Sequence, residues 1–318
     1  MYEINPVHEQ IYFLRYLGTT WPTSSNIFLL RDGYGLSVID TGLNKPDSFQ
    51  GFTRCLDQLG YKISDIHTVL LTHGHTDHIA GVRKIQQFCN PRILLPGACI
   101  PEAVDPRSQE NAVLPASVRD IQPALRHYDI LKEFRNSCGE WVLSEKEILG
   151  FRNGDDIELG AYRFRAIHTP GHDAGLMVYY EPGIKLLLTT DLLRAAIPGN
   201  ALPWYCSTGG GVSEYLGALD RIETLDVAKV YPSHGKLNGA FTKHVRKTRN
   251  IILERENRIV AAIKEGPMTC EQLDGLLYTP LALKYCPWFS SCTEAHLKKL
   301  ETEGKVERDG LFFHWKDR

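Results

Sequence analysis

The chain has 318 residues and a formal net charge of −2, so no overall basic charge favours nucleic acid. It is 43% hydrophobic and 23% charged, as in ordinary globular proteins, and no stretch approaches the roughly 18 apolar residues of a membrane helix. The eight cysteines are scattered without a Cys-x-x-Cys pair, and the first ten residues lack the pattern of a secretory signal. We therefore expect reduced thiols and a cytoplasmic location.

Strand and helix patterns alternate over the first 96 residues. Apolar runs rich in β-branched and aromatic residues indicate strands, and turn residues separate them. Pro46 opens a helical stretch that stops at Gly60. The predicted helices lie at 46–60 and 79–89, and the predicted strands at 10–16, 26–32, 36–42, 67–73 and 92–96.

Residues 97–150 are less regular, and we interpret them as a helical insertion. Prolines interrupt the first part, and 122–134 has helical spacing. The insertion carries Tyr128, Phe134 and Trp141, so it could form a lid over a pocket for a partly apolar substrate. The alternative is that these aromatic side chains only pack the insertion onto the rest of the protein.

The strand pattern resumes at Asp155, so the theme of strands followed by a helix occurs twice in the chain. The second set of predicted elements comprises strands at 155–169, 176–181 and 185–191, a helix at 212–225 and a strand at 227–232. Residues 1–242 are therefore predicted to form one catalytic domain.

Residues 243–318 are predicted to form a small winged-helix-like domain of three helices and a terminal hairpin with Asp309-Gly310 at its turn. This part has 14 Lys and Arg against 11 Asp and Glu. Because a nucleic-acid-binding face is normally more basic, a structural or dimerising role is favoured over nucleic-acid binding. The apolar segment 287–291 could lie against the catalytic domain or reach the active site of a partner.

The segment LLTHGHTDHIAG, residues 70–81, has three histidines and an aspartate within the six positions 73–78. His73 and His75 follow a predicted strand, where alternate side chains point the same way, so both can reach one ion. Asp77 and His78 follow as the chain enters a helix. Imidazole suits zinc, aspartate adds an oxygen ligand, and four ligands exceed what one ion needs from one loop. The pattern predicts two adjacent metal ions; the alternative is a polar loop whose histidines cap a helix.

Three more ligand-type residues follow predicted strands, namely His172, Asp191 and His234. Each alone would be an ordinary polar group at the end of a strand. The loops at strand ends of α/β folds collect functional side chains, so we expect these three to join the histidine-rich segment.

These residues, in this order, resemble the motifs of the metallo-β-lactamase superfamily, and VIDTG at 38–42 resembles its first motif. The resemblance covers roughly residues 10–240. Within the superfamily, the sequence is similar to the hydrolase branch of glyoxalase II and lactonases. It implies an α/β fold of the αβ/βα type. Two mixed sheets would pack face to face, with helices outside and the site along one edge.

The resemblance also implies a role for each residue. Asp191 would bridge two metal ions, and Asp40 would orient a ligand imidazole, unless it only caps the Asp-Thr-Gly turn. The ligands of the first ion would be His73, His75 and His172, and those of the second ion Asp77, His78 and His234.

Two divalent ions about 3.5–4 Å apart lower the pKa of a bridging water towards 7, so a hydroxide can attack a carbonyl or phosphoryl group. Asp77 could hydrogen-bond this hydroxide and later pass on its proton. An aspartate at position 191 resembles the glyoxalase II, lactonase and phosphodiesterase branches, because lactam-cleaving enzymes typically have cysteine there. Tyr205 could donate to a developing oxyanion, or be a structural tyrosine of its loop.

The sequence thus predicts a metal-dependent hydrolase, with two zinc ions, of a small thioester, lactone or carboxylic ester. The first alternative is a nuclease or phosphodiesterase whose C-terminal domain holds RNA or DNA. The second is an iron-dependent redox enzyme such as a persulfide dioxygenase or flavo-diiron protein, because these ligands also accept iron or manganese. A DNA-binding regulator is disfavoured by the complete ligand set. We expect a small-molecule substrate and no membrane association, with a homodimer as one option.

Overall fold

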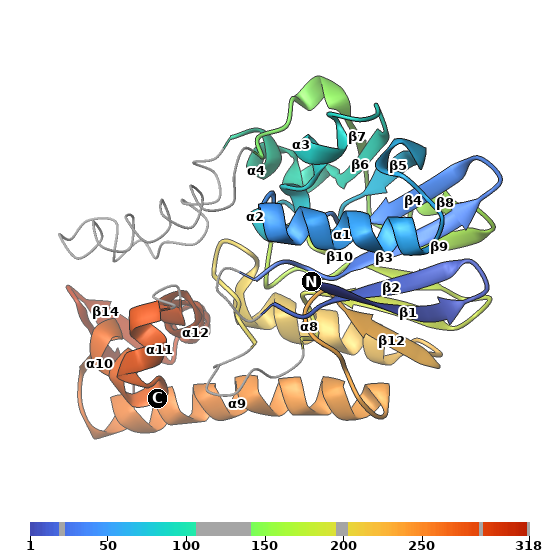
Figure 1. Cartoon of the computed structure of the whole chain (residues 1–318). Helices are drawn as coiled ribbons and strands as arrows, with labels where there is room; N and C mark the ends of the chain where they lie inside the picture. The colour runs from blue at the N-terminus through green and yellow to red at the C-terminus, as the bar shows by residue number, and fades with distance from the viewer. Residues whose placement is uncertain (19–22, 106–140, 195–202, 286–288, 317–318) are drawn as a thin grey trace.

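The computed structural model describes residues 1–18, 23–105, 141–194, 203–285 and 289–316 (Figure 1). Two β-sheets pack face to face with helices on their outer faces, which confirms the predicted α/β sandwich of two mixed sheets (Figure 1). Within the described ranges no helix has both the length and the apolarity to cross a membrane. The six cysteines in these ranges are all free.

The first sheet has seven strands in the order β1 to β7. Its first four strands are antiparallel and its last four parallel, so it is mixed. A parallel pair needs a crossover, and helix α1 (Pro46–Gln58) supplies it between β4 and β5. The strands are β1 (Tyr2–His8), β2 (Ile11–Tyr16), β3 (Ile27–Asp32), β4 (Gly35–Ile39), β5 (Ile66–Leu70), β6 (Arg92–Pro96) and β7 (Ile148–Phe151).

The second sheet has five strands in the order β12-β11-β10-β9-β8. Its two last strands in sequence are parallel, and helix α8 (Gly211–Glu223) connects them. The strands are β8 (Asp156–Leu159), β9 (Tyr162–His168), β10 (Met177–Glu181), β11 (Leu186–Thr190) and β12 (Lys229–Pro232).

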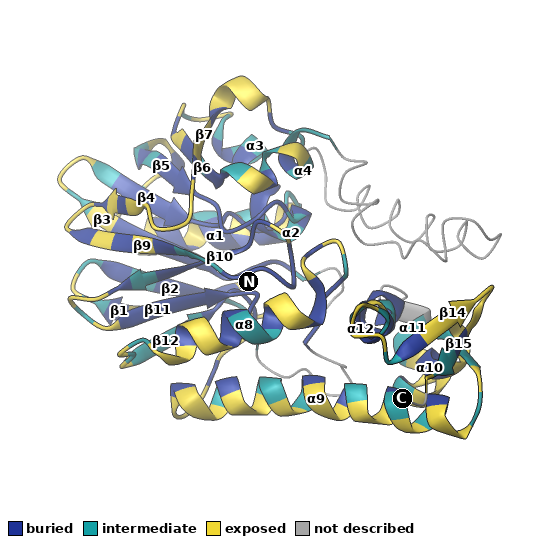
Figure 2. Cartoon of the chain, turned by 180° about the vertical axis from the view of Figure 1, so that it is seen from behind, coloured by how far each residue is buried: buried dark blue, intermediate teal, exposed yellow. Residues whose placement is uncertain are grey.

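Three apolar clusters hold these layers together. The middle cluster fills the space between the sheets, where alternate residues of facing strands meet, among them Phe13, Phe28, Phe164 and Tyr179. The outer face of the first sheet packs against α1, and that of the second sheet packs against α8. Figure 2 shows the strands mostly buried, whereas α8 and α9 (Phe241–Glu265) are exposed along their outer sides.

The C-terminal part contains α9 and a separate apolar cluster formed with the elements that follow it. The hairpin predicted at 305–315 is confirmed, and it belongs to a three-stranded sheet of order β13-β15-β14. Helices with a small sheet are consistent with the predicted small domain; its winged-helix identity and the boundary at 242 stay predictions. The elements are α10 (Cys270–Leu277), α11 (Pro280–Tyr285), α12 (Ser290–Thr302), β13 (Met268–Thr269), β14 (Val306–Asp309) and β15 (Phe312–Trp315).

The structure differs from the sequence prediction in three places. Strand β1 was not predicted, although it pairs with β2 along its whole length. The helix predicted at 79–89 is instead two short pieces, α2 (Thr76–Ile79) and α3 (Val82–Ile85). The predicted insertion 97–150 contains the short helix α4 (Ile100–Val104) and strand β7 of the main sheet, so it is not purely helical.

The lid prediction falls mainly on residues 106–140, which lie outside the described residues and include Tyr128 and Phe134. Trp141 is described, and only 3% of it is exposed. Its ring belongs to the apolar cluster beneath the first sheet, so the packing alternative holds for this residue.

Candidate metal centre

The predicted ligands all follow the carboxyl ends of strands, in loops or, for Asp77 and His78, in the short helix α2. The histidine-rich segment follows β5, and Asp40 follows β4 directly. From the second sheet, His172, Asp191 and His234 follow β9, β11 and β12 respectively. Because the two sheets pack face to face, these strand ends bring the side chains to one edge of the sandwich.

The first group of side chains that could hold a metal ion is His73, His75 and His172, whose ligand atoms all lie within 4.8 Å of one another. His172 Nε2 is 3.2 Å from His75 Nδ1. The segment after β5 therefore meets the loop after β9, as the sequence predicted.

The second group is Asp77, His78 and His234, again with ligand atoms within 4.8 Å of one another. Asp77 Oδ2 lies 3.2 Å from His234 Nε2, and the Nε2 atoms of His78 and His234 are 3.3 Å apart. One ligand atom of each side chain therefore lies close to those of the other two, as a shared metal ion requires.

Asp191 lies between the two groups. Its Oδ2 is 3.3 Å from His172 Nε2, and its Oδ1 is 3.5 Å from His234 Nε2 and 3.6 Å from His78 Nε2. The residue before it, Thr190, has a φ of 48°, which is unusual for a β-branched residue. This backbone strain turns the chain at the end of β11 and is typical of functional sites.

Asp40 orients His78 of the second group by accepting a hydrogen bond from the ring nitrogen that faces away from the other ligands. Its Oδ2 is 2.8 Å from His78 Nδ1, so this nitrogen donates and His78 Nε2 is left free. Thr72 donates to Asp40 through its backbone N–H and its hydroxyl, both at 3.0 Å. Because that hydroxyl hydrogen is used, Thr72 Oγ1 accepts from His73 Nδ1, which leaves His73 Nε2 free as well.

Protonation preferences fit the same arrangement. Burial, together with neighbouring imidazoles, lowers the pKa of His73, and burial lowers the pKa of His172 to about 3. Burial opposes the charged form of His78 too, but Asp40, Asp77 and Asp191 outweigh it and raise its pKa to about 9. Three carboxylates around one imidazole leave an excess of negative charge that a cation would balance.

Two buried atoms show that these residues fit a metal ion. His73 Nε2 and Asp191 Oδ1 are buried and have no hydrogen-bond partner among the described residues. Such atoms are rare in folded proteins, because an unpaired buried polar group is costly. Both are ligand-type atoms, and both face the cluster, so a divalent ion would satisfy them.

The predicted role of Tyr205 as an oxyanion donor is not supported by its position. Tyr205 is fully buried, and its hydroxyl is 2.6 Å from His296 Nε2 and 2.7 Å from Arg255 Nη1. Both partners belong to the C-terminal helices, so the hydroxyl points away from the histidine cluster. It serves as a buried link between the two parts of the chain.

The residue beside it, Trp204, was not predicted. Its carbonyl oxygen accepts from His172 Nδ1 at 3.3 Å, and its ring lies 4.8 Å from the His172 ring and 5.8 Å from the His75 ring. Its Nε1 donates to Ser291 Oγ of α12 at 3.0 Å. No sequence signal relates a tryptophan 32 positions later to His172.

Asp173 and Glu102 form a second unpredicted feature beside His75. Asp173 Oδ2 is 3.9 Å from His75 Nε2, and the two acidic side chains share a hydrogen bond. Burial and the charge of Asp173 raise the pKa of Glu102 to about 10, so Glu102 carries the shared proton. Asp173 could have been found from its place next to His172; Glu102 could not.

Asn26 was also missed, although it fixes the loop that carries His234. Its Nδ2 donates to the carbonyl oxygens of Pro232 and Gly235, at 3.0 and 2.9 Å. These two residues lie on either side of His234. The side chain of Asn26, which directly precedes β3 of the first sheet, therefore holds the ligand loop of the second sheet.

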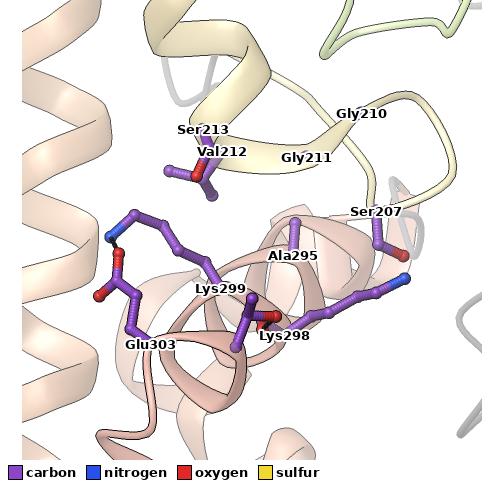
Figure 3. Close-up of a pocket in the computed structure, with 10 residues that line it drawn as sticks. Ser207, Gly210, Gly211, Val212, Ser213, Ala295, Lys298, Lys299 and Glu303 are labelled. Atoms are coloured by element: carbon purple, nitrogen blue, oxygen red, sulfur yellow. Dashed lines mark hydrogen bonds and ion pairs between the residues drawn. The ribbon is translucent and has the colours of Figure 1, made fainter.

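A separate pocket of about 190 Å³ lies where the start of α8 meets α12 (Figure 3). Its walls include the glycine-rich turn at Gly210 and Gly211 and the stem of Lys299, whose amine pairs with Glu303 (Figure 3). It contains none of the predicted ligands, so it is not part of the histidine cluster.

Comparison with known proteins agrees with this geometry. The sequence matches the model of the Metallo-beta-lactamase superfamily over residues 20–234, more than half of the chain. A Bacillus subtilis protein named "Probable metallo-hydrolase YqjP" is 26% identical over 302 residues, which cover 91% of each chain. Hydroxyacylglutathione hydrolase from Brucella ovis is 24% identical over 170 residues, 52% of this chain and 49% of that enzyme.

Two crystal structures share the fold across nearly the whole chain. A metallo-beta-lactamase family protein from Thermus thermophilus has a TM-score of 0.71 at 22% identity, covering 96% of this chain and 99% of its own. A beta-lactamase domain protein from Burkholderia ambifaria has a TM-score of 0.79 at 19% identity, covering 99% and 94%. The family match, the sandwich and the histidine–aspartate cluster agree, and the chain belongs to the metallo-beta-lactamase superfamily.

Proposed function

We propose that this protein is a metal-dependent hydrolase that cleaves a small ester-like molecule, such as a thioester, a lactone or a carboxylic ester, at two divalent ions, with zinc as the expected metal. The observation that carries the proposal is the position of Asp191 between two ligand groups, with imidazole nitrogens of both groups at 3.3–3.6 Å from its two oxygens. Two adjacent metal ions, when bound, supply a hydroxide at neutral pH and polarise the substrate oxygen.

The residues of the chain divide the remaining tasks among them. Asp40 and Thr72 hold the ligand histidines in the tautomer that leaves Nε2 free. Asp77 is the most exposed carboxylate of the cluster, with 20% of its side chain accessible, so it is placed to accept and return a proton at Oδ2. Hydrogen bonding and charge from His78 and His234 outweigh burial and keep its pKa low, so it is ionised at neutral pH.

The relatives support a hydrolase of an acyl compound more than a nuclease. One group of them is named for the hydrolysis of hydroxyacylglutathione. The C-terminal domain has no strongly basic composition, which favours a small-molecule substrate over RNA or DNA.

The test is a metal analysis combined with a substrate panel. The protein, purified without added metal, is analysed by mass spectrometry and assayed against a thioester, a lactone, a phosphodiester and a short RNA. We expect about two zinc ions per chain and cleavage of carbonyl esters, lost in Asp77→Asn and retained in Asp57→Asn on the exposed side of α1. Cleavage confined to phosphodiester or RNA would favour a nuclease, and bound iron without hydrolysis would favour redox chemistry.

A further inference from the structure

Arg194 lies beside the cluster, and the proposed function gives it no role. It follows Asp191 by three residues, and its Nη1 is 3.3 Å from Asp191 Oδ2. Only 18% of the side chain is exposed, and its Nε is buried without a hydrogen-bond partner among the described residues. A guanidinium has five N–H donors, and among the described residues the contact with one carboxylate oxygen uses few of them.

The charges of the site point the same way. Two divalent cations would draw on the negative charge of the four carboxylates in or against the ligand groups, Asp40, Asp77, Asp173 and Asp191. Asp191 would share its charge with the ions, so it would neutralise the guanidinium of Arg194 only in part. Among the described residues, no other Arg or Lys forms an ion pair with these four carboxylates.

A guanidinium whose charge is neutralised only in part attracts an anion strongly in a partly buried site, because water screens it poorly there. Its planar N–H groups suit the oxygens of a carboxylate or a phosphate. Asp191 holds the guanidinium at one side of the cluster, so an anion bound to its free edge would lie next to the reacting group of the substrate.

We propose that Arg194 binds an anionic group of the substrate, a carboxylate or a phosphate, close to the bond that is cleaved. This inference rests on the proposed function and narrows its substrates to esters or thioesters that carry a negative charge near the acyl group. Arg194 is thereby a specificity-determining residue, whereas the metal ligands determine the chemistry.

The test uses three acetyl thioesters with the same scissile bond, made from thioglycolate, 2-mercaptoethyl phosphate and the neutral thioglycolamide. The wild-type protein with its bound metal should prefer one or both charged probes by about tenfold or more in kcat/KM. Arg194→Gln should lower kcat/KM for the preferred charged probe by about 10- to 100-fold, mainly through KM, and change the neutral probe less than about threefold. Arg194→Lys should recover part of the loss.

Arg163→Gln is the matched control, because Arg163 is 65% exposed on β9 and pairs with Asp156 and Glu158 away from the cluster. The metal content of each variant is measured beside its kinetics. A preference for the thioglycolate or the phosphate probe identifies the anionic group. An equal loss for all three probes, or no loss for any, would overturn the inference, because Arg194 would then only position Asp191 or do nothing.

Binding separates this inference from the proposed function. The thioether acid (methylthio)acetate, which has no thioester bond to cleave, and its neutral amide are titrated into the metal-loaded protein by calorimetry. This measurement requires no turnover. Tighter binding of the acid in wild type, lost in Arg194→Gln, supports the anion site even if none of the thioesters is cleaved. Equal affinity for acid and amide in the wild-type protein contradicts it, whatever the kinetics show.

Discussion

Asp40 is a buried residue that connects the start of the histidine-rich segment, at Thr72, with its end, at His78. Four donors converge on Asp40, two from Thr72, one from His78 and one from Ser233. Its φ of 57° lies in the left-handed region, which aspartate and asparagine tolerate better than most residues. Position 40 therefore needs a residue that tolerates a left-handed backbone and, separately, a carboxylate that accepts hydrogen bonds.

Asp40→Asn should keep the fold and weaken metal binding. Asparagine tolerates the same backbone conformation, but it has only one accepting oxygen. Donors meet both oxygens of Asp40, so the asparagine NH2 would face either the Thr72 N–H or the His78 Nδ1–H. We expect the affinity for the second metal ion to fall by about 10- to 100-fold, measured by competition with a chelator. Asp32→Asn is the control, because Asp32 also contacts an imidazole, His67, at 3.1 Å, far from the cluster. Equal affinities in the two variants would contradict the role of Asp40.

The ligands could be predicted because four of them stand in one short segment and the others each follow a strand. Apart from Asp40, the residues that orient them could not. Trp204 and Asn26 act through a backbone carbonyl and an amide in loops far away in sequence, and neither has a metal-binding side chain. The contacts of Tyr205 could not be predicted for the same reason, since its partners come from helices 50 and 91 residues later.

At the level of segments, residues 203–206 connect the cluster to the C-terminal helices. Arg255 of α9 donates to the Pro203 carbonyl at 3.1 Å and is only 6% exposed. Cys292 Sγ accepts from the Tyr205 backbone N–H at 3.4 Å, and Ser291 Oγ donates to the Tyr205 carbonyl at 3.3 Å. The segment that supplies the acceptor for His172 is thus held by helices α9 and α12 of the C-terminal part.

Trp204→Phe should weaken metal binding through this connection. The change removes the hydrogen bond to Ser291 and keeps an aromatic ring against His172. We expect a loss of about 1 kcal/mol in stability and a lower affinity for the first metal ion, measured by thermal unfolding and chelator competition. Trp315→Phe, whose ring lies under Lys264 at 4.6 Å, should affect stability alone. If both variants bind metal as wild type does, the connection has no effect on the site.

Glu256 makes the stability of the C-terminal part depend on pH. Burial opposes its charge, but hydrogen bonds from His296 and Lys299 outweigh this and lower its pKa to about 2. Its contribution is complete above the ordinary glutamate pKa near 4.5 and is lost as the pH falls towards 2. Asp274 acts in the opposite direction, since burial raises its pKa to about 6 and stability declines as the pH rises through 4 to 6.

Comparing Glu256→Gln with wild type isolates the glutamate, because Asp274 is the same in both. The variant should unfold about 1 kcal/mol more easily at pH 7, and the difference should shrink below pH 4.5. Urea unfolding at several pH values measures it. A difference that stays constant down to pH 3 would mean that the charge of Glu256 is unimportant.

Across the molecule, the two parts share an apolar cluster. Val245 and Ile252 of α9 and Cys292 and Ala295 of α12 pack in the same cluster as the residues of α8. A chain ending at residue 242 would cut α9 after its second residue and expose this surface to water. We expect such a chain to be insoluble or to unfold at least 10 °C lower, by circular dichroism. Unchanged thermal stability would show that the first 242 residues form an independent unit.

The sandwich could be predicted because its motifs recur in a known order and its strands alternate with helices. Its edges were harder. Strand β1 contains Pro6 and has exposed and half-buried positions without regular alternation, so its sequence resembles a loop. Strand β7 has only four residues, two of them exposed, and it joins the sheet through β6, a partner distant in sequence. Such pairings follow from tertiary packing and leave little local pattern.

Each of the two ligand groups takes side chains from loops of both sheets, so bound ions would connect the two sheets. Bound ions would fasten the sheets together along one edge, whereas the opposite edge would depend on side-chain packing alone. Removing them with a chelator should speed amide hydrogen–deuterium exchange in the loops after β5, β9 and β11 and leave the β3–β4 turn near Asp32 and Gly35 unchanged. A uniform increase would mean that the ions stabilise the whole fold instead. The localised result would mean that catalysis and the closure of the sandwich depend on the same few bonds.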